Sequence, residues 1–291
     1  MASDPTVKGE SIDNSSNGLR VRRERSHRIR IDATSICVTL MCLAAPAQAQ
    51  WLGYPAPGVP RTLDGKVNLT APVGRMPDGK PDLSGTWESG RGYFSDLARD
   101  LKPDEVVMKP WAQAATADTE KNLHGNDLLV QCLPPGVPRI NMTGGPGMPH
   151  PFKIVQTPAL VVLLYETSGN QTFRQVFLDG RPLPGAPQPT WLGYSIGHWE
   201  GDTLVVETAG FNGRAWLDTA KGHPQTEEAR VTERFTRRDV GHMEIDITID
   251  DPKAYEKPWR TRVPAHLLPD SDLIETFCEN ERDYGHIKLA R

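Results

Sequence analysis

The chain has 291 residues, enough for one large or two small domains, and carries 33 basic and 37 acidic side chains for a net charge of −4. This acidic balance argues against nucleic acid and anionic membrane as partners. No apolar run reaches the roughly 18 residues that span a bilayer, so the sequence predicts no transmembrane segment.

Residues 1–49 have the order of features found in an export signal. Basic residues between 20 and 30 precede an apolar stretch from about Ala33 to Pro46, which ends in Ala47-Gln48-Ala49. A basic region, a short apolar region and a small-residue cleavage site are typical of a secretory signal peptide. We therefore expect a periplasmic or secreted protein that begins near Gln50; a buried N-terminal helix is the alternative.

The next segment, residues 50–110, is predicted to be an extended Pro/Gly-rich arm followed by a first strand near 81–87. The whole chain contains 26 glycines and 26 prolines, and this composition disfavours long helices. One short helix is expected at about 110–123, because a proline at a first helical position is followed by good helix formers. A further Pro/Gly loop is expected at 133–151.

From residue 152 onward, β-branched and aromatic segments alternate with turn residues. Between 244 and 250, acidic and hydroxyl side chains alternate with isoleucines, the pattern of a strand with one solvated face. Many sequential hairpins predict an all-β fold in which an antiparallel meander closes into a lipocalin-like barrel or sandwich over residues 111–291. The expected strands cover about 152–157, 159–167, 172–178, 193–199, 203–209, 230–237, 242–250, 259–267 and 273–279.

Two cysteines, Cys132 and Cys278, remain after the expected signal peptide is removed. In an oxidising compartment, two cysteines far apart in the sequence most simply form a disulfide. Neither has a second cysteine within a few residues, which disfavours a structural zinc site. The common catalytic and nucleotide-binding motifs are also absent from the sequence, so we expect no cofactor and no metal.

Glu233 is the most specific candidate for acid–base catalysis. It lies between Val231 and Phe235, on the side of its strand that is expected to face the core. A carboxylate inside a barrel must be paired or have a raised pKa, and a raised pKa is typical of general acids and bases. A structural ion pair between Glu233 and an arginine is the competing interpretation.

Two neighbouring predicted strands supply further candidates. Tyr194 and His198 share one face of the first strand, and Glu207 lies on the second. Tyr194 and Glu207 are candidate catalytic residues and His198 is a candidate binding residue. Alternatively, these side chains only cover a solvated face of the sheet.

A long connection at 210–228 is expected to fold over the barrel mouth, where functional loops concentrate. It contains Asp218 and His223 as candidate catalytic residues, and Trp216 and Glu227 as candidate binding residues. An ordinary surface loop is the alternative. A metal site of His223, Asp218 and Glu227 has suitable ligand types, but their spacing matches no metal motif.

Trp191 and Arg139 complete the expected binding residues. Tryptophans form platforms for sugars and flat apolar ligands, although burial at strand ends is the more common reason for their presence. Arg139 is expected near the same pocket as Glu233.

Five phrases between about residues 81 and 283 belong together: CLPPGVPR at 132–139, and the segments 151–158, 173–184, 191–208 and 231–235. In these phrases the chain resembles a family of uncharacterised exported bacterial β-rich proteins that are numerous in some soil bacteria. Members often have a second histidine where this chain has Gln225, and a basic residue where it has His198. The resemblance implies export and a β-rich fold.

Two functions follow as expectations. The first is an exported enzyme of lyase, hydrolase or isomerase/cyclase type that acts on a small molecule, such as a sugar derivative, an ester or a cyclisable natural product, by acid–base chemistry without a nucleotide cofactor. The second is a periplasmic lipocalin-like binding protein. The enzyme interpretation expects Glu233 and His223 to line one concave pocket, with Tyr194, Glu207 and Asp218 nearby. A structural partner in the cell envelope is a third alternative.

Overall fold

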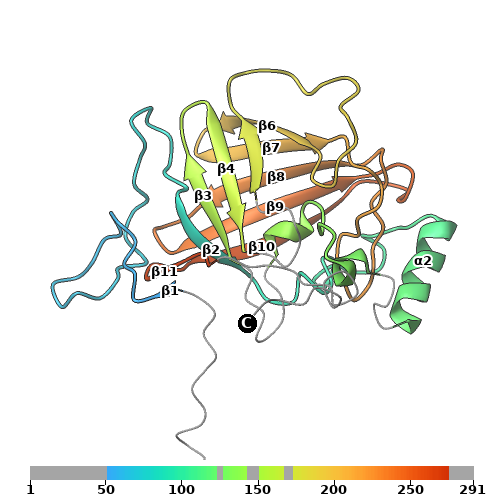
Figure 1. Ribbon diagram of the computed structural model, residues 1–291, viewed down its shortest axis with the longest axis horizontal. Coiled ribbons are helices and arrows are strands. Elements are labelled where there is room, and N and C mark those ends of the chain that lie inside the picture. Colours follow the sequence, from blue (N-terminus) through green and yellow to red (C-terminus); the bar gives the residue numbers. More distant parts are fainter. Residues whose placement is uncertain (1–50, 123–126, 143–150, 167–172, 275–291) are drawn as a thin grey trace, which may run out of the picture. The chain divides into compact units, whose positions relative to one another are not determined.

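A computed structural model describes residues 51–122, 127–142, 151–166 and 173–274, which belong to one compact unit, Ala47–Arg291. Nine strands close into a barrel (Figure 1), so the predicted all-β barrel is confirmed. The strands are β2 (Gly85–Ser89), β3 (Phe152–Gln156), β4 (Leu160–Tyr165), β5 (Phe173–Phe177), β6 (Tyr194–Glu200), β7 (Thr203–Ala209), β8 (Arg230–Arg237), β9 (His242–Asp250) and β10 (Trp259–Leu267).

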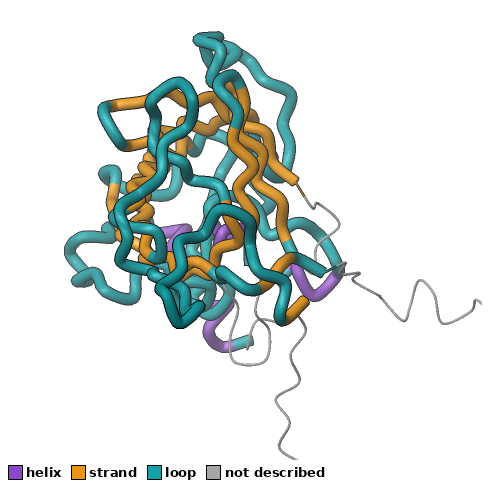
Figure 2. The backbone as a smooth tube through the Cα atoms, turned by 90° about the vertical axis from the view of Figure 1, so that its left-hand side faces the viewer, coloured by secondary structure: helices purple, strands orange, loops and turns teal. Residues whose placement is uncertain are grey.

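Successive strands are neighbours around the barrel, and β10 closes it by pairing with β2. Period-two alternation forms the core: along β9, Ile245, Ile247 and Ile249 are fully buried while the residues between them are partly exposed. Closure gives every barrel strand a neighbouring strand on both sides. Figure 2 shows the strands in orange and the teal loops that join them.

One pair departs from the expected antiparallel order. Strands β5 and β6 run parallel and pair only at Val176↔Ser195 and Phe177↔Ile196. The expectation of a hairpin was wrong because the connection between the two strands is long and proline-rich, and crosses back before the chain re-enters the barrel. Gly197 permits the close approach, because a Cβ at this position would lie 2.8 Å from the Leu178 side chain.

The N-terminal arm contains a two-residue strand, β1 (Trp51–Leu52), which pairs with β11 (Ser271–Asp272). Its later part is joined to the turn between β8 and β9, where the backbone N–H of Gly241 donates to Leu69 and that of Val240 donates to Ala71. Within the arm, antiparallel bridges join Arg61 to Val67 and Arg75 to Pro81, so the chain turns back on itself twice along this segment.

Helix α2 (Pro110–Lys121) has its proline at the first helical position, as predicted. Two short 3-10 helices, η1 (Leu128–Gln131) and η2 (Arg139–Asn141), lie in the segment that follows. In the described part of the chain, no helix has the length and apolar character needed to cross a membrane.

Several expectations fall outside the described residues. These are the signal peptide, most of the last predicted strand, and Cys278. Cys132 is buried and follows η1. Its disulfide with Cys278 therefore stays a prediction.

Candidate functional site

Glu233 lies inside the barrel and is fully buried, as its position in the alternation predicts. Its Oε1 atom accepts a hydrogen bond of 2.5 Å from the Nδ2 atom of Asn141. Its Oε2 atom lies 2.6 Å from Nη2 of Arg174, whose side chain is also buried. The structural interpretation, in which an arginine compensates the buried carboxylate, thus describes the observed geometry.

Further hydroxyl groups surround this ion pair. The guanidinium of Arg174 donates to Ser195 Oγ at 2.9 Å and to Thr208 Oγ1 at 2.7 Å. Tyr165 donates through its hydroxyl to Asn141 Oδ1 at 2.8 Å. Cross-strand register explains the assembly, because Ser195 pairs with Thr208 and Glu233 pairs with Val206, all on the inner face.

We call these six side chains, Asn141, Tyr165, Arg174, Ser195, Thr208 and Glu233, the interior polar network. Burial disfavours the charge on Arg174, yet its pKa is raised overall because the Glu233 and Tyr165 side chains favour the charged form. Burial also raises the pKa of Tyr165, so its phenol keeps its proton and serves as a donor. The network therefore holds a fixed ion pair, which is suited to positioning and poorly suited to exchanging protons.

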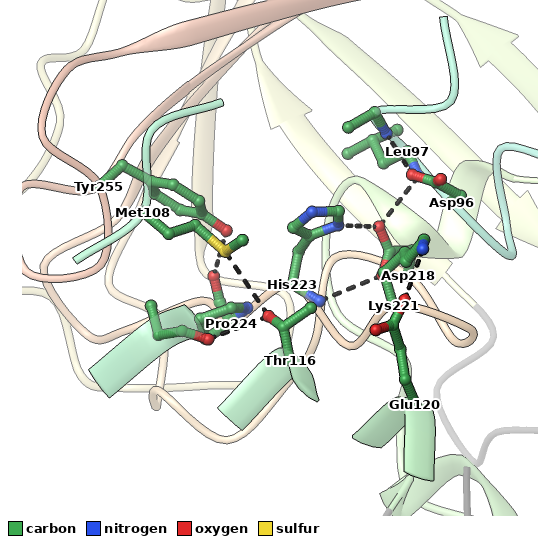
Figure 3. Close-up of polar contacts among 12 residues, drawn as sticks. Asp96, Leu97, Met108, Thr116, Glu120, Asp218, Lys221, His223, Pro224 and Tyr255 are labelled. Atoms are coloured by element: carbon green, nitrogen blue, oxygen red, sulfur yellow. Dashed lines mark hydrogen bonds and ion pairs between the residues drawn. The ribbon is translucent and has the colours of Figure 1, made fainter. Parts of the chain in front are cut away.

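The connection between β7 and β8 contains a second buried group. The Nδ1 atom of His223 donates to Asp218 Oδ2 at 2.5 Å, and the Leu97 backbone N–H donates to the same oxygen at 2.9 Å. The other oxygen of Asp218 accepts from the His223 backbone N–H at 3.1 Å. In Figure 3, His223 lies between Asp218 on one side and Tyr255 with Met108 on the other.

The Asp218–His223 pair has the geometry of an orienting carboxylate and a histidine base. Burial lowers the affinity of His223 for a proton, but its hydrogen bond and charge interaction with Asp218 outweigh this effect and raise its pKa. No described residue forms a hydrogen bond with the Nε2 atom of His223. This nitrogen therefore remains chemically uncommitted within the described part of the protein.

Asp96 lies beside this pair, and oxygen or nitrogen atoms of Asp96, Asp218 and His223 come within 4.8 Å of one another. Such a set could bind a divalent cation by ligand type. Both Asp218 oxygens already accept hydrogen bonds from N–H groups, however, and these donors occupy most of the lone pairs that a cation would use. The arrangement fits a hydrogen-bonded carboxylate better than a metal ligand.

None of the four pockets described for the chain is lined by both Glu233 and His223, and a pocket that they share stays a prediction. His223 packs near Trp259, with ring centroids 6.1 Å apart. Trp259 of β10 and Val231 of β8 both pair with Ile249 of β9, which lies between them. Along β8, Val231 is two residues, or about 7 Å, from Glu233.

Tyr194, His198 and Glu207 share a face, but it is the outer face of the barrel. Their neighbours Ser195 and Thr208 point inward to Arg174, so alternation directs Tyr194 and Glu207 away from Glu233. The hydroxyl of Tyr194 accepts from Arg181 at 3.0 Å, and His198 contacts Glu200 at 3.2 Å. The expected catalytic grouping with Glu233 is therefore not formed.

Trp216 and Glu227 line a different feature, a groove of about 570 Å³ beside α2. Glu227 forms an ion pair there with Lys253. Gly222 and Pro224 contribute to the wall, whereas His223 between them does not. The two expected binding residues thus meet in one groove, and the expected base lies behind it.

Arg139 is buried against the interior of the fold and pairs with Asp127. Thr219 also donates to this carboxylate, at 2.8 Å. Burial disfavours the charged form of Asp127, but Arg139 compensates and lowers its pKa overall. Asp127 therefore joins Arg139 of its own segment to Thr219 of the 210–228 connection, which is a structural task.

The short parallel pairing of β5 and β6 leaves a pocket of about 330 Å³, lined by residues within 173–177 and 190–195, which we call the seam pocket. Its walls include Trp191 and Tyr194, which were expected, and Phe173 and Phe177, which were not. In the sequence, the alternation of aromatic residues with Arg174 along β5 indicates an aromatic outer face. It does not indicate how β5 pairs with β6, so the pocket could not be predicted from it.

No protein-family model matches this chain, and no curated protein is significantly similar to it.

Proposed function

We propose that the protein binds a small molecule in the seam pocket, as a lipocalin-like binding protein of the periplasm or the extracellular space. The observation that carries the proposal is a concave site in which four aromatic side chains converge on the outer face of the barrel. Its volume of about 330 Å³ is within the usual range for small-molecule sites. Exposed aromatic surface of this kind favours ligand binding, because a soluble domain otherwise buries it.

The barrel interior supports this proposal over the expected enzyme. Glu233 is compensated by Arg174 and Asn141, and its side chain is closed off from solvent. A general acid or base must reach its substrate within hydrogen-bonding distance, which this arrangement does not allow. The interior polar network instead gives the barrel wall beside the pocket a fixed geometry.

A thermal-shift screen of a small-molecule library tests the binding function. Compounds that raise the unfolding temperature of the wild type are repeated with Trp191→Ala, and with Trp216→Ala as the matched control in the groove beside α2. We expect the shifts to be lost with Trp191→Ala and kept with Trp216→Ala. Shifts that survive Trp191→Ala, or a library without any stabilising compound, would contradict the proposal.

An acid–base enzyme remains the second candidate, because Asp218 and His223 form a buried pair that resembles the orienting carboxylate and base of hydrolytic enzymes. The uncommitted Nε2 atom of His223 would accept the proton. Glu233 has no part in this version. The reaction class stays as broad as the sequence suggested, namely lyase, hydrolase or isomerase.

A panel of p-nitrophenyl esters and small lactones tests this candidate. Asp218→Asn retains the side-chain shape but removes the charge that stabilises the imidazolium, so turnover should fall at least a hundredfold if the pair is catalytic. Circular dichroism confirms that the variant is folded. Turnover by the wild type that persists in both Asp218→Asn and His223→Gln would exclude this pair as the catalytic site.

A further inference from the structure

We propose that the ligand of the seam pocket is an organic anion with a flat, apolar body, such as an aromatic carboxylate. This inference rests on the proposed binding function and adds the chemical class of the ligand. The shape of the walls, the cations around them and the lack of acidic side chains in the described lining favour this class of ligand.

The walls of the pocket favour a flat, apolar body. Phe177 and Tyr194 stack with their ring centroids 5.3 Å apart and an angle of 23° between the planes. Phe173 exposes 47% of its surface on the same face of β5. The Phe177 ring is already contacted by Tyr194 and by Arg181, so a planar ligand would stack on the other aromatic walls of the pocket.

Two arginines lie over these aromatic rings. The Cζ atom of Arg181 is 3.9 Å from the ring centroid of Phe177, and that of Arg214 is 5.2 Å from the ring of Trp191. Arg181 also donates to the hydroxyl of Tyr194. The aromatic walls therefore have guanidinium groups at two sides.

The three arginines in and around the pocket differ in how far an acidic partner already compensates their charge. Arg181 pairs with Asp179, and Arg174 beneath the pocket pairs with Glu233. The guanidinium of Arg214, by contrast, forms no hydrogen bond or ion pair with any described residue, and the side chain is exposed. Arg214 lines a neighbouring cavity together with Trp191, not the seam pocket itself. Its guanidinium, 5.2 Å from the Trp191 ring, is the group with hydrogen-bonding capacity and charge for a ligand that extends past Trp191.

No acidic side chain is among the described residues that line the pocket, although the chain as a whole has a net charge of −4. A bound cation would find no carboxylate among these lining residues. A bound carboxylate would receive charge-assisted hydrogen bonds from Arg214, which guanidinium groups make in a planar, paired geometry. Charge complementarity therefore selects an anion.

Isothermal titration calorimetry with two probes of the same ring system tests the inference: 2-naphthoate, an anion, and 2-naphthalenemethanol, its neutral counterpart. We expect naphthoate to bind at least about tenfold more tightly in low salt, and this advantage to shrink at high salt because Arg214 is exposed. Arg214→Gln should remove most of the preference and leave the affinity for the alcohol unchanged. Arg260→Gln, the same change at an exposed position of β10, is the matched control.

The possible outcomes separate the two proposals. Equal binding of both probes, with loss of both in Trp191→Ala, would overturn the anion inference and leave the binding function intact. A preference for naphthoate that Arg260→Gln reduces as much as Arg214→Gln would overturn it too, because only net charge would then matter. Failure of both probes to bind at millimolar concentration would count against both proposals.

Discussion

At the residue scale, the centre of the barrel depends on a charge pair that is completely withdrawn from water. Glu233 and Arg174 compensate each other at 2.6 Å, and Asn141, Ser195 and Thr208 satisfy much of their remaining hydrogen-bonding capacity. Such a pair contributes little net stability relative to an apolar core, but removal of one partner leaves the other charge buried and uncompensated. A change such as Glu233→Gln, which keeps the shape of the side chain but removes its charge, should therefore destabilise the fold.

Glu233→Gln should lower the free energy of unfolding by about 3 to 5 kcal/mol, because Arg174 then stays buried without a counter-charge. Glu207→Gln is the matched control. It makes the same change on the outer face of the adjacent strand, where a substitution costs about 0.5 kcal/mol or less. Urea unfolding of both variants measures the difference. Equal losses would show that the ion pair with Arg174 does not determine the cost of replacing Glu233.

His223 should make the stability of the protein depend on pH. Its pKa is raised in the folded state by Asp218, so its contribution is complete below the unfolded value of about 6.5 and disappears as the pH rises through the folded pKa. The loss of stability caused by His223→Gln should consequently be larger at pH 5.5 than at pH 8.5. Urea unfolding at both pH values measures it, with exposed His198→Gln as control. A loss that is the same at both values would contradict the assignment.

At the element scale, the parallel contact of β5 with β6 creates the seam pocket and depends on Gly193, where the chain enters β6. This residue has φ of +65°, and a Cβ would lie 2.8 Å from the carbonyl oxygen of Ala209. A left-handed conformation and a backbone contact thus both require glycine at this position. The strand can begin at Tyr194 only if the preceding residue passes this close to β7.

Gly193→Ala should therefore destabilise the protein more than Gly201→Ala. Gly201 also has a positive φ, at +59°, but a Cβ there meets no atom within 4 Å. The control should lose about 1 kcal/mol through backbone strain alone, and Gly193→Ala about 1 to 3 kcal/mol more through the clash. Urea unfolding measures both values. Equal losses would mean that the entry to β6 can shift without cost.

At the scale of the whole molecule, the expected disulfide would join the segment before the barrel to the end of the chain. Cys132 and Cys278 would close a loop of about 147 residues. In the chain-entropy model, the lower entropy of the cross-linked unfolded chain raises the free energy of unfolding by roughly 4 to 5 kcal/mol. Reducing agent should lower the urea midpoint of exported protein, and a Cys132→Ser, Cys278→Ser double variant should not respond. Two thiols that titrate in the exported, unreduced protein would refute the bond.

The sequence by itself determined the local structure of this protein. Alternation along 242–250, turn residues between strands and the proline before 111–121 predicted elements that the structure reproduces to within a few residues. It also identified Glu233 as an inward carboxylate and Asp218 with His223 as neighbours. These features depend on contacts within one strand or one loop, so a short window of sequence contains the information.

Only the tertiary structure decided which groups meet. Alternation shows that Tyr194 and His198 share a face, but not that the opposite face, with Ser195, points toward Arg174. Arg174 compensates Glu233 from a strand far away in the sequence, and the seam pocket exists because β6 returns parallel to β5. The physical reason is that register and barrel closure depend on the packing of all strands together, which no local pattern of residues specifies.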